Sequence, residues 1–491
     1  MEAWWPKMFD VSPELAESGY AWEIADAPIL HNALNIADIA HALDLLDAGA
    51  ISRADTQTLL GGLLHLESLP SSEVNYDPSI GEMVTCREQF LVNLVGPVAG
   101  SLRAGRTRRE AVRTALRLVV RQQVLALTQD SCALIEAICA RSIEHSHSLM
   151  PDYTYLQPAQ ASTFGHYLLS FADPVLRDAN RLLSEYVHVN SSVSGSGGAN
   201  GSVIIRDRMR AAHNLGFNKP IEHIRDAMWQ TDPFLHVLFS ATTLTLGQDR
   251  LAEDLEIFAS REFGFLSLGN SSVRPSVLMP QKRNPYALSV VRGSTGILIG
   301  RLSGQLALSK APSARSDTYI YAYGELPRSL ALAGQVTRLL TSVVRDLVVH
   351  EARMKSAIEG SNTEATDAAH LLMRSCGLDY LTAHRVVHAA VTHAAEGDRG
   401  ICAEDITWAL SDGGFDPEQV EADEFNEIFD PMALIQSRKS IGGAAPDTVT
   451  AMAGSLLAAA LDLRTRLGTE QNNSESAESH LLIRARELVQ E

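Results

Sequence analysis

Apolar residues recur every three or four positions along most of the chain, which is the spacing of a buried helix face. The spacing predicts five long helices, over residues 108–150, 162–190, 231–262, 286–309 and 324–355. Pro174 predicts a kink in the second of them. These helices are much longer than the average of about 11–12 residues in globular proteins. We therefore expect an all-α fold around a long-helix bundle, whose exposed apolar stripes favour oligomers.

Polar and glycine-rich stretches divide these helices. Residues 191–202 are rich in Gly and Ser, and residues 468–479 contain few hydrophobic side chains, so we expect a disordered segment there. Between the third and fourth helices lies a polar loop, 270–286, with Pro275, Pro280 and Pro285. A long loop inside a helical chain is more often functional than idle. This loop presents a hydroxyl, an ammonium and an amide, on Ser276, Lys282 and Asn284.

Composition narrows the function classes. The net charge of −18 argues against a nucleic-acid partner, because phosphate binding needs a basic surface. Five cysteines without a CxxC pair argue against a disulfide framework or a zinc site, and they fit a reducing compartment. No signal peptide and no apolar run of about 18 residues is evident. We expect a cytoplasmic protein that needs no membrane.

Four arginines in seven positions, Arg103, Arg106, Arg108 and Arg109, stand just before the first long helix. They form either a solvated face or a clamp for carboxylates, since arginine binds carboxylates in a bidentate manner. The segment 153–160 is polar without charge, which fits either the orientation of a polar ligand or a plain connection between helices.

Two other motifs are weaker. Residues 195–201 contain four glycines but lack the GxxxxGK(S/T) form of a nucleotide-binding loop. A tight turn, with or without a place in the lining of a site, is the better interpretation. His145 and His147 are spaced like metal ligands, but no acidic cluster supports them. We predict no metal site.

Residues 276–285, Ser-Val-Leu-Met-Pro-Gln-Lys-Arg-Asn-Pro, resemble the signature G-S-x-x-M-x-x-K-x-N of the fumarase/aspartase superfamily, with Pro275 in place of the glycine. Residues 105–110, 154–160 and 366–372 are similar to segments of its argininosuccinate lyase branch. Within that branch, Tyr155 and the Ala-Tyr-Gly-Glu run at 322–325 look most like the ethylenediamine-disuccinate (EDDS) lyases. The resemblance covers nearly the whole chain.

The resemblance implies an all-α homotetramer of three-domain subunits, with each active site shared between subunits and no metal or organic cofactor. The domains are expected at 1–107, 108–360 and 361–467, followed by a flexible tail at 468–491. The implied reaction is the reversible elimination of an amine from an N-substituted aspartate, giving fumarate. The implied partners are small dicarboxylate and amine molecules.

The resemblance also implies roles for individual residues. Ser276 is the expected base, and Lys282 and Asn284 are expected to stabilise the doubly charged intermediate. Five residues are expected to bind substrate: Arg108, Arg109, Thr154, Tyr155 and Gln157.

Several positions depart from the argininosuccinate lyase pattern. Tyr155 replaces a histidine and Arg109 an asparagine, and Arg315, Ile320 and Tyr323 replace a tyrosine, a glutamine and a lysine. A site that has lost polar partners should reject its original substrate. Argininosuccinate lyase activity and a non-catalytic, crystallin-like role remain the two alternatives.

Overall fold

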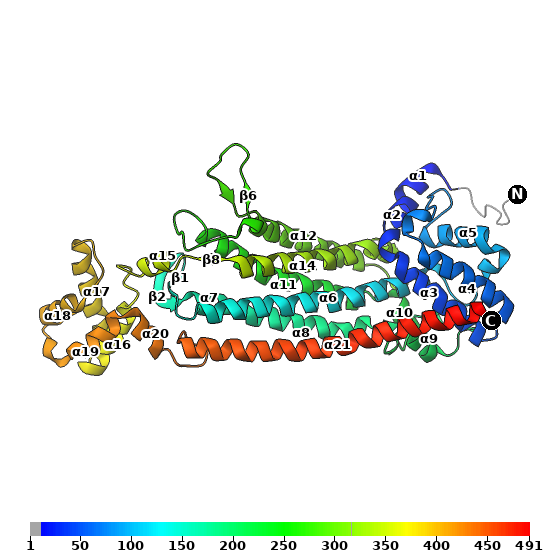
Figure 1. Ribbon diagram of the computed structural model, residues 1–491. Helices are drawn as coiled ribbons and strands as arrows, with labels where there is room; N and C mark the ends of the chain where they lie inside the picture. The colour runs from blue at the N-terminus through cyan, green and yellow to red at the C-terminus, as the bar shows by residue number, and fades with distance from the viewer. Residues whose placement is uncertain (1–10, 316) are drawn as a thin grey trace.

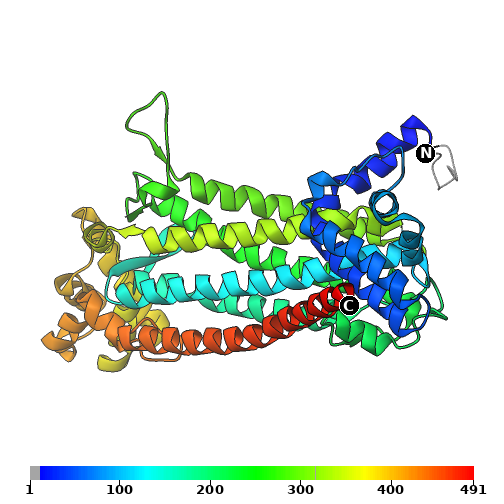
Figure 2. The same cartoon turned by 45° about the vertical axis from the view of Figure 1, so that its right-hand side comes forward.

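A bundle of long helices forms the centre of the computed structural model, which describes residues 11–315 and 317–491 (Figures 1 and 2). The predicted all-α class is confirmed. The bundle helices are α6 (Arg108–Glu144), α8 (Ala172–Val189), α11 (Asp232–Phe258), α12 (Tyr286–Ser309), α14 (Ala322–Asp346) and α21 (Pro446–Gln490). Their buried faces share one core, in which Leu116, Leu244 and Leu330 are almost completely excluded from water. Burial of these stripes is the main force that aligns the helices.

A smaller group of helices, called the N-terminal domain below, covers one end of the bundle and has its own core around Ile39, Leu43 and Leu59. Its main helices are α3 (Ala27–Asp47), α4 (Arg53–Ser68) and α5 (Met83–Val95). Short elements complete this end: α1 (Pro13–Leu15), a π-helix (Ala16–Tyr20), α2 (Ala21–Ala25), 3₁₀ turns at Ser71–Glu73 and Gly96–Arg103, α9 (Arg208–Asn214), α10 (Ile224–Trp229) and α13 (Asp317–Ile320). Gly49, with a φ of 66°, follows α3 as a helix-ending glycine.

A second group of helices lies at the opposite end of the bundle and has a third core, which contains Leu372, Val387 and Leu410. Its helices are α16 (Ala365–Ser375), α17 (Tyr380–Glu396), α18 (Ala403–Asp412), a 3₁₀ turn (Pro417–Gln419), α19 (Ala422–Phe429) and α20 (Pro431–Ser437).

The C-terminal helix α21 corrects two expectations. The boundary expected at 467 falls inside this helix, and the segment 468–490 is helical rather than a flexible tail. Val449 and Leu463 belong to the bundle core, whereas Leu481 and Leu488 pack into the core of the N-terminal domain. Leu481, Ala485 and Leu488 of this segment lie on one buried face, so low hydrophobic content did not mean disorder.

The region 149–190 also differs from its prediction. A hairpin of β1 (Leu149–Thr154) and β2 (Gln157–Thr163) comes first, then α7 (Phe164–Leu169) and α8. Pro174 lies in the first turn of α8, where backbone N–H groups have no acceptor within the helix, so the proline produces a helix start rather than a kink.

The fifth predicted helix is interrupted in a similar way. β8 (Val348–Val349) separates α14 from α15 (Glu351–Ser356) and pairs with β5 (Leu266–Ser267). Two more ribbons join β3 (Ser191–Ser192) to β4 (Lys219–Pro220) and β6 (Arg274–Pro275) to β7 (Arg283–Asn284). A 3₁₀ turn at Asn270–Ser272 precedes β6. None of the described helices combines the length and the apolar character that crossing a lipid bilayer demands.

Candidate functional site

The signature residues lie on a hairpin that projects from the side of the bundle (Figure 1). The backbone N–H of Ser276 donates to the carbonyl of Lys282 at 3.1 Å, which places these two residues opposite each other at the mouth of the loop. The Ser276 Oγ accepts a hydrogen bond from the N–H of Met279 at 3.0 Å, and the Asn284 Nδ2 donates to the Arg274 carbonyl at 2.9 Å. The chain thus brings all three predicted catalytic residues onto one ribbon.

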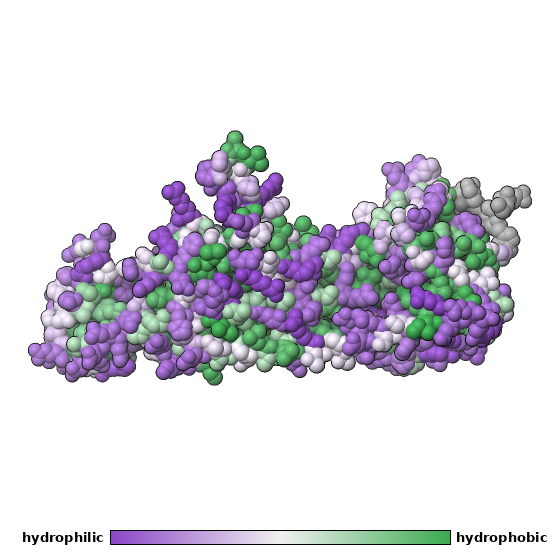
Figure 3. All heavy atoms as spheres, viewed as in Figure 1, coloured by the Kyte–Doolittle hydropathy of each residue, from purple (hydrophilic) through white to green (hydrophobic). Residues whose placement is uncertain are grey.

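The tip of this hairpin is apolar and exposed. Val277 is 105% exposed and Leu278 is 87% exposed, and the space-filling view shows apolar atoms at the end of the projection (Figure 3). Lys282 is also exposed. The rest of the described chain therefore leaves the hairpin that carries the signature residues uncovered.

The arginine-rich segment at the start of α6 is paired with carboxylates of the N-terminal domain. The Arg108 Nη1 lies 2.8 Å from the Glu82 Oε1, and the Arg109 Nη1 lies 2.8 Å from the Glu23 Oε2. Burial raises the pKa of Glu23, and the neighbouring Arg109 opposes this effect. Arg108 and Arg109 are therefore neither a fully solvated surface nor a pair of unpartnered guanidinium groups, because each is already paired with a glutamate.

The other two arginines of the segment are held more firmly. The Arg106 Nη2 lies 2.6 Å from the Asp38 Oδ1, and both side chains are largely buried. Arg103 forms a bidentate pair with Glu88. These two arginines act as structural anchors, whereas half of the Arg108 side chain is exposed and available to a ligand.

Glu110 is a buried residue whose role was not apparent in the sequence. Its carboxylate accepts hydrogen bonds from the backbone N–H groups of Gly195 at 2.7 Å, Ser196 at 3.2 Å and Gly197 at 2.8 Å. Burial raises the pKa of Glu110 to about 7, against the opposing effects of Arg106 and these three amides. The glycine-rich loop is therefore a tight turn, as expected, and it encloses a protein carboxylate.

That loop packs closely against the arginine segment. A Cβ on Gly105 would come within 2.6 Å of the Ser202 Oγ, and one on Gly197 within 2.7 Å of the backbone of Ser202. Both glycines have a positive φ, which L side chains rarely adopt. The close approach and the Glu110 contacts together fix the backbone that carries Arg108 and Arg109.

Thr154, Tyr155 and Gln157 lie at the tight turn of the β1–β2 hairpin. Tyr155 and Leu156 form the turn itself, with φ values of 55° and 57°. Positive φ at both central positions is typical of a type I′ turn, the form that matches the twist of a two-residue hairpin. All three side chains are exposed, and Tyr155 is 101% exposed. The turn therefore presents them outward, away from its own chain.

These three segments do not form one site within a single chain. The 37 residues of α6 separate Arg108 from the β1–β2 hairpin, which corresponds to about 55 Å along the helix axis. Figure 1 places the arginine segment at the end covered by α3 to α5, and both hairpins toward the opposite end. No hydrogen bond or ion pair joins the two hairpins in the described part of the chain.

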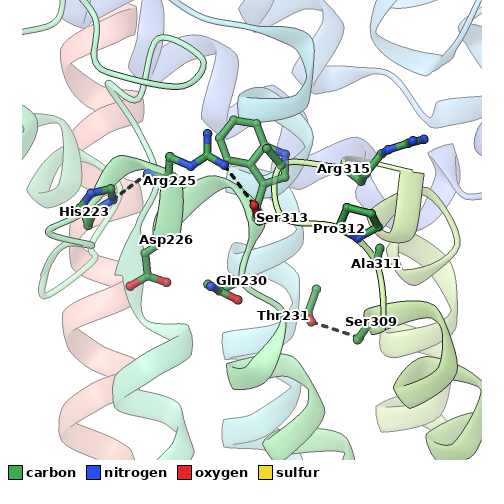
Figure 4. Close-up of a pocket in the computed structure, with 12 residues that line it drawn as sticks. His223, Arg225, Asp226, Gln230, Thr231, Ser309, Ala311, Pro312, Ser313 and Arg315 are labelled. Carbon is green, nitrogen blue, oxygen red and sulfur yellow. Dashed lines mark hydrogen bonds between the residues drawn. The ribbon is translucent and has the colours of Figure 1, made fainter.

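A cavity of about 360 Å³ adjoins the segment 309–315, which precedes the departures at Ile320 and Tyr323. Figure 4 shows this segment opposite α10, with the Arg225 Nη2 donating to the Ser313 Oγ at 3.3 Å across the cavity. Tyr323, which stands where the branch pattern has a lysine, is fully buried.

The histidine pair near the end of α6 has protein partners. The His145 Nδ1 lies 2.9 Å from the Ser148 Oγ and 3.3 Å from the Glu351 Oε1, and the His147 Nδ1 lies 3.1 Å from the Ser146 Oγ. Within residues 11–315 and 317–491, no group of three or more His, Cys, Asp or Glu side chains is arranged to hold a metal ion.

Known proteins match the chain along most of its length. A family model described as a lyase matches residues 66–300. Argininosuccinate lyase 1 of Mesorhizobium japonicum is 32% identical over 419 residues, covering 84% of this chain and 88% of that protein. Argininosuccinate lyase of Methanocaldococcus jannaschii is 28% identical over 442 residues, covering 90% and 89%. A crystal structure of EDDS lyase in complex with formate has a TM-score of 0.88 at 24% identity, covering 98% and 97%.

The match to the lyase family model includes the arginine segment and both hairpins, and the solved structure shares the fold over 98% of the chain. The chain therefore belongs to the fumarase/aspartase superfamily, in the branch of the argininosuccinate lyases.

Proposed function

We propose that this chain, a carbon–nitrogen lyase that releases fumarate, acts on an N-substituted aspartate related to ethylenediamine disuccinate. The observation that carries the proposal is the hairpin on which Ser276 and Lys282 face each other, joined by a 3.1 Å backbone hydrogen bond. A hydroxyl and an ammonium carried by paired positions of one hairpin are suited to proton removal beside a carboxylate, because the reaction builds negative charge there.

In the proposed mechanism Ser276 removes the proton from the carbon next to a substrate carboxylate. The pKa of a serine hydroxyl is very high, so the base needs positive charge nearby to ionise. Lys282 supplies that charge and, with Asn284, stabilises the doubly charged carboxylate that forms. Loss of the amine then gives fumarate. The protonation of the leaving amine has no assigned residue, because Tyr155 is a weak acid near neutral pH.

Arg108 and Arg109 are the proposed carboxylate ligands, with Thr154 and Gln157 orienting the substrate. Their present partners, Glu82 and Glu23, hold the two guanidinium groups in place before substrate arrives. The extra cation at position 109 suits a substrate with more carboxylates than argininosuccinate has.

The proposed active site is assembled from more than one subunit of a homotetramer. Support comes from the separation of the three segments along the bundle and from the uncovered catalytic hairpin. Further support comes from apolar side chains exposed on two bundle helices, namely Phe239 and Leu246 on α11 and Ile297, Ile299 and Leu306 on α12. An apolar stripe of this kind on a long helix favours association.

The departures favour this substrate over argininosuccinate. A lysine at position 323 would reach a ligand as a flexible cation, whereas the buried Tyr323 has no exposed surface. Tyr155 replaces the histidine that the branch pattern has at the turn. A site built to hydrogen-bond its substrate discriminates by about 10⁴- to 10⁵-fold against a ligand that leaves those groups unpaired, so a changed set of polar groups favours a different substrate.

The test measures the ultraviolet absorbance of fumarate in reactions that contain the purified protein. One reaction contains fumarate and ethylenediamine, and a parallel reaction contains argininosuccinate alone. We expect fumarate to be consumed in the first reaction, with no fumarate released in the second. Ser276→Ala should abolish the consumption.

The other outcomes separate the alternatives. Fumarate release from argininosuccinate would identify an argininosuccinate lyase and overturn the proposed substrate. No change in either reaction, repeated with a series of other amines, would support the non-catalytic, crystallin-like role.

A further inference from the structure

A second cavity, of about 450 Å³, lies beside α6 and contains charged side chains of both signs. Its volume falls in the range of small-molecule sites. The charged residues come from separate parts of the fold: Arg117 from α6, Lys219 from β4, Glu222 from the following loop, Asp226 from α10 and Asp232 from the start of α11. Four structural elements therefore converge on one opening.

Arg117 lines this opening, and among the described residues its guanidinium donates to carbonyl oxygens and not to a carboxylate. Its side chain is 2% exposed, and its Nη1 donates to the carbonyls of His188 at 2.9 Å and Val189 at 3.3 Å. Its guanidinium also stacks on the ring of Phe234, 5.1 Å from the centroid. Among the described residues, none of the carboxylates forms an ion pair with it. A buried cation without an anionic partner is costly.

The carboxylates of the cavity are close enough to act on Arg117 through space. Burial lowers the pKa of Arg117, and Tyr319, Asp226 and Asp232 oppose that effect. Within the described part of the chain, no ion pair joins Lys219, Asp226 or Asp232 to another side chain. The gap between the guanidinium and these carboxylates is therefore open to a ligand that satisfies both.

We propose that this cavity binds an α-amino acid at a site distinct from the catalytic residues. The ligand carboxylate binds Arg117 and Lys219, and its ammonium group binds Asp226 and Asp232. A simple anion would meet three carboxylates, and a metal ion would meet two cations, so neither fits the walls. An α-amino acid carries both charges on one carbon, which matches the two sets of groups.

The site is placed to influence the reaction. Arg117 follows Arg108 by nine residues in the same helix, so a bound amino acid contacts the element that carries both proposed carboxylate ligands. Asp226 and Gln230 line this cavity and also the neighbouring cavity beside the segment 309–315. Figure 4 shows both residues in the lining of the neighbouring cavity.

The test is isothermal titration calorimetry of the full-length protein with L-alanine, L-aspartate and L-arginine. Propionate and isopropylamine, each carrying one of the two charges of alanine, are titrated in parallel. We expect at least one amino acid to bind saturably and about tenfold more tightly than either half, because both charge-assisted contacts are then made.

Variants on the cavity rim locate the binding. Lys219→Ala and Asp226→Asn should each weaken it by about tenfold. Arg225→Ala, on the same helix as Asp226 but facing the neighbouring cavity, should leave it unchanged, and so should Arg108→Ala. Both rim residues are exposed, so these variants should keep the thermal midpoint of the parent protein.

Three results would overturn the proposal. They are the absence of saturable heat with all three amino acids, binding that Lys219→Ala and Asp226→Asn leave intact, and binding that Arg108→Ala removes. The last would assign the heat to the catalytic site instead.

Discussion

The Glu23 Oε2 accepts a hydrogen bond from the Arg109 Nη1 at 2.8 Å, and this pair joins the N-terminal domain to the first turn of α6. Glu23 is 4% exposed, so the pair holds a buried carboxylate as well as a proposed substrate ligand. The two partners are 86 residues apart in the chain. A substitution of either residue should therefore affect both the stability of the protein and the proposed binding of substrate.

Arg109→Ala should raise KM for the N-substituted aspartate more than it lowers kcat. Removing a charge-assisted contact to a carboxylate costs about 1.5–3 kcal/mol, which corresponds to about 10- to 100-fold in KM. Steady-state kinetics by fumarate absorbance measures the effect. Arg103→Ala is the control, since Arg103 belongs to the same segment and also pairs with a glutamate, Glu88, but has no proposed contact with substrate. This variant should leave KM unchanged. An unchanged KM with a lowered melting temperature would show that Arg109 is purely structural.

Ser276→Ala should lower kcat by a factor of about 10³ or more, because it removes the proposed base. The hairpin is exposed, so the melting temperature should stay within about 1 °C of the parent protein. Ser271→Ala provides the control, as its hydroxyl bonds Asp346 outside the signature. Activity retained in Ser276→Ala would remove this serine from the mechanism.

Glu110 should make stability fall as pH rises. Its pKa is raised from 4.5 to about 7, so the folded chain binds this proton more tightly than the unfolded chain does. The stabilisation is complete below pH 4.5 and is lost as pH rises toward 7, with a total of at most about 3 kcal/mol. Urea unfolding at a series of pH values measures the slope.

Glu110→Gln tests this assignment by removing the titrating group. The slope between pH 4.5 and 7 should become flatter than in the parent protein. The free energy of unfolding should also fall, by about 2 kcal/mol, because an amide nitrogen would face backbone N–H donors. Glu144→Gln, at the exposed far end of α6, should change neither quantity. A slope that Glu110→Gln leaves unaltered would assign the pH dependence to other buried carboxyls.

Leu481→Ala should destabilise the protein by about 2–4 kcal/mol, because Leu481 is 4% exposed and its loss leaves a cavity in the core of the N-terminal domain. Ile483→Ala is the matched control on the same helix, since Ile483 is 50% exposed and should cost less than about 1 kcal/mol. Denaturant unfolding compares the two. Equal midpoints would contradict the docking of the C-terminal helix.

Ile297→Glu should weaken the proposed tetramer, because it puts a charge into the exposed apolar stripe of α12. Light scattering should report a smaller particle, and activity should fall with it, since the active site is proposed to need more than one subunit. Ser289→Glu, which is exposed near the start of the same helix, should leave the mass unchanged. A monomeric parent protein with full activity would refute the shared site.

The sequence alone was sufficient for three of the five predicted long helices and for the position of the loop that carries the signature residues. Helix periodicity is a local property, so α6, α11 and α12 could be predicted within a few residues of their observed ends. Prolines mark the segment 275–285 as non-helical, and its spacing of Ser, Lys and Asn carries the family resemblance. Such signals need no knowledge of distant contacts.

Only the tertiary structure decided where the charged and weakly apolar segments belong. The sequence left Arg108 and Arg109 as either a solvated face or a carboxylate clamp, but they pair with Glu82 and Glu23, which lie 26 and 86 residues away. The Glu110 carboxylate finds its donors 85 residues later, in a loop whose glycines alone indicate only a turn. The polar end of α21 is ordered because Leu481 and Leu488 meet another domain. Long-range pairing depends on the folded arrangement of whole elements, which no local pattern encodes.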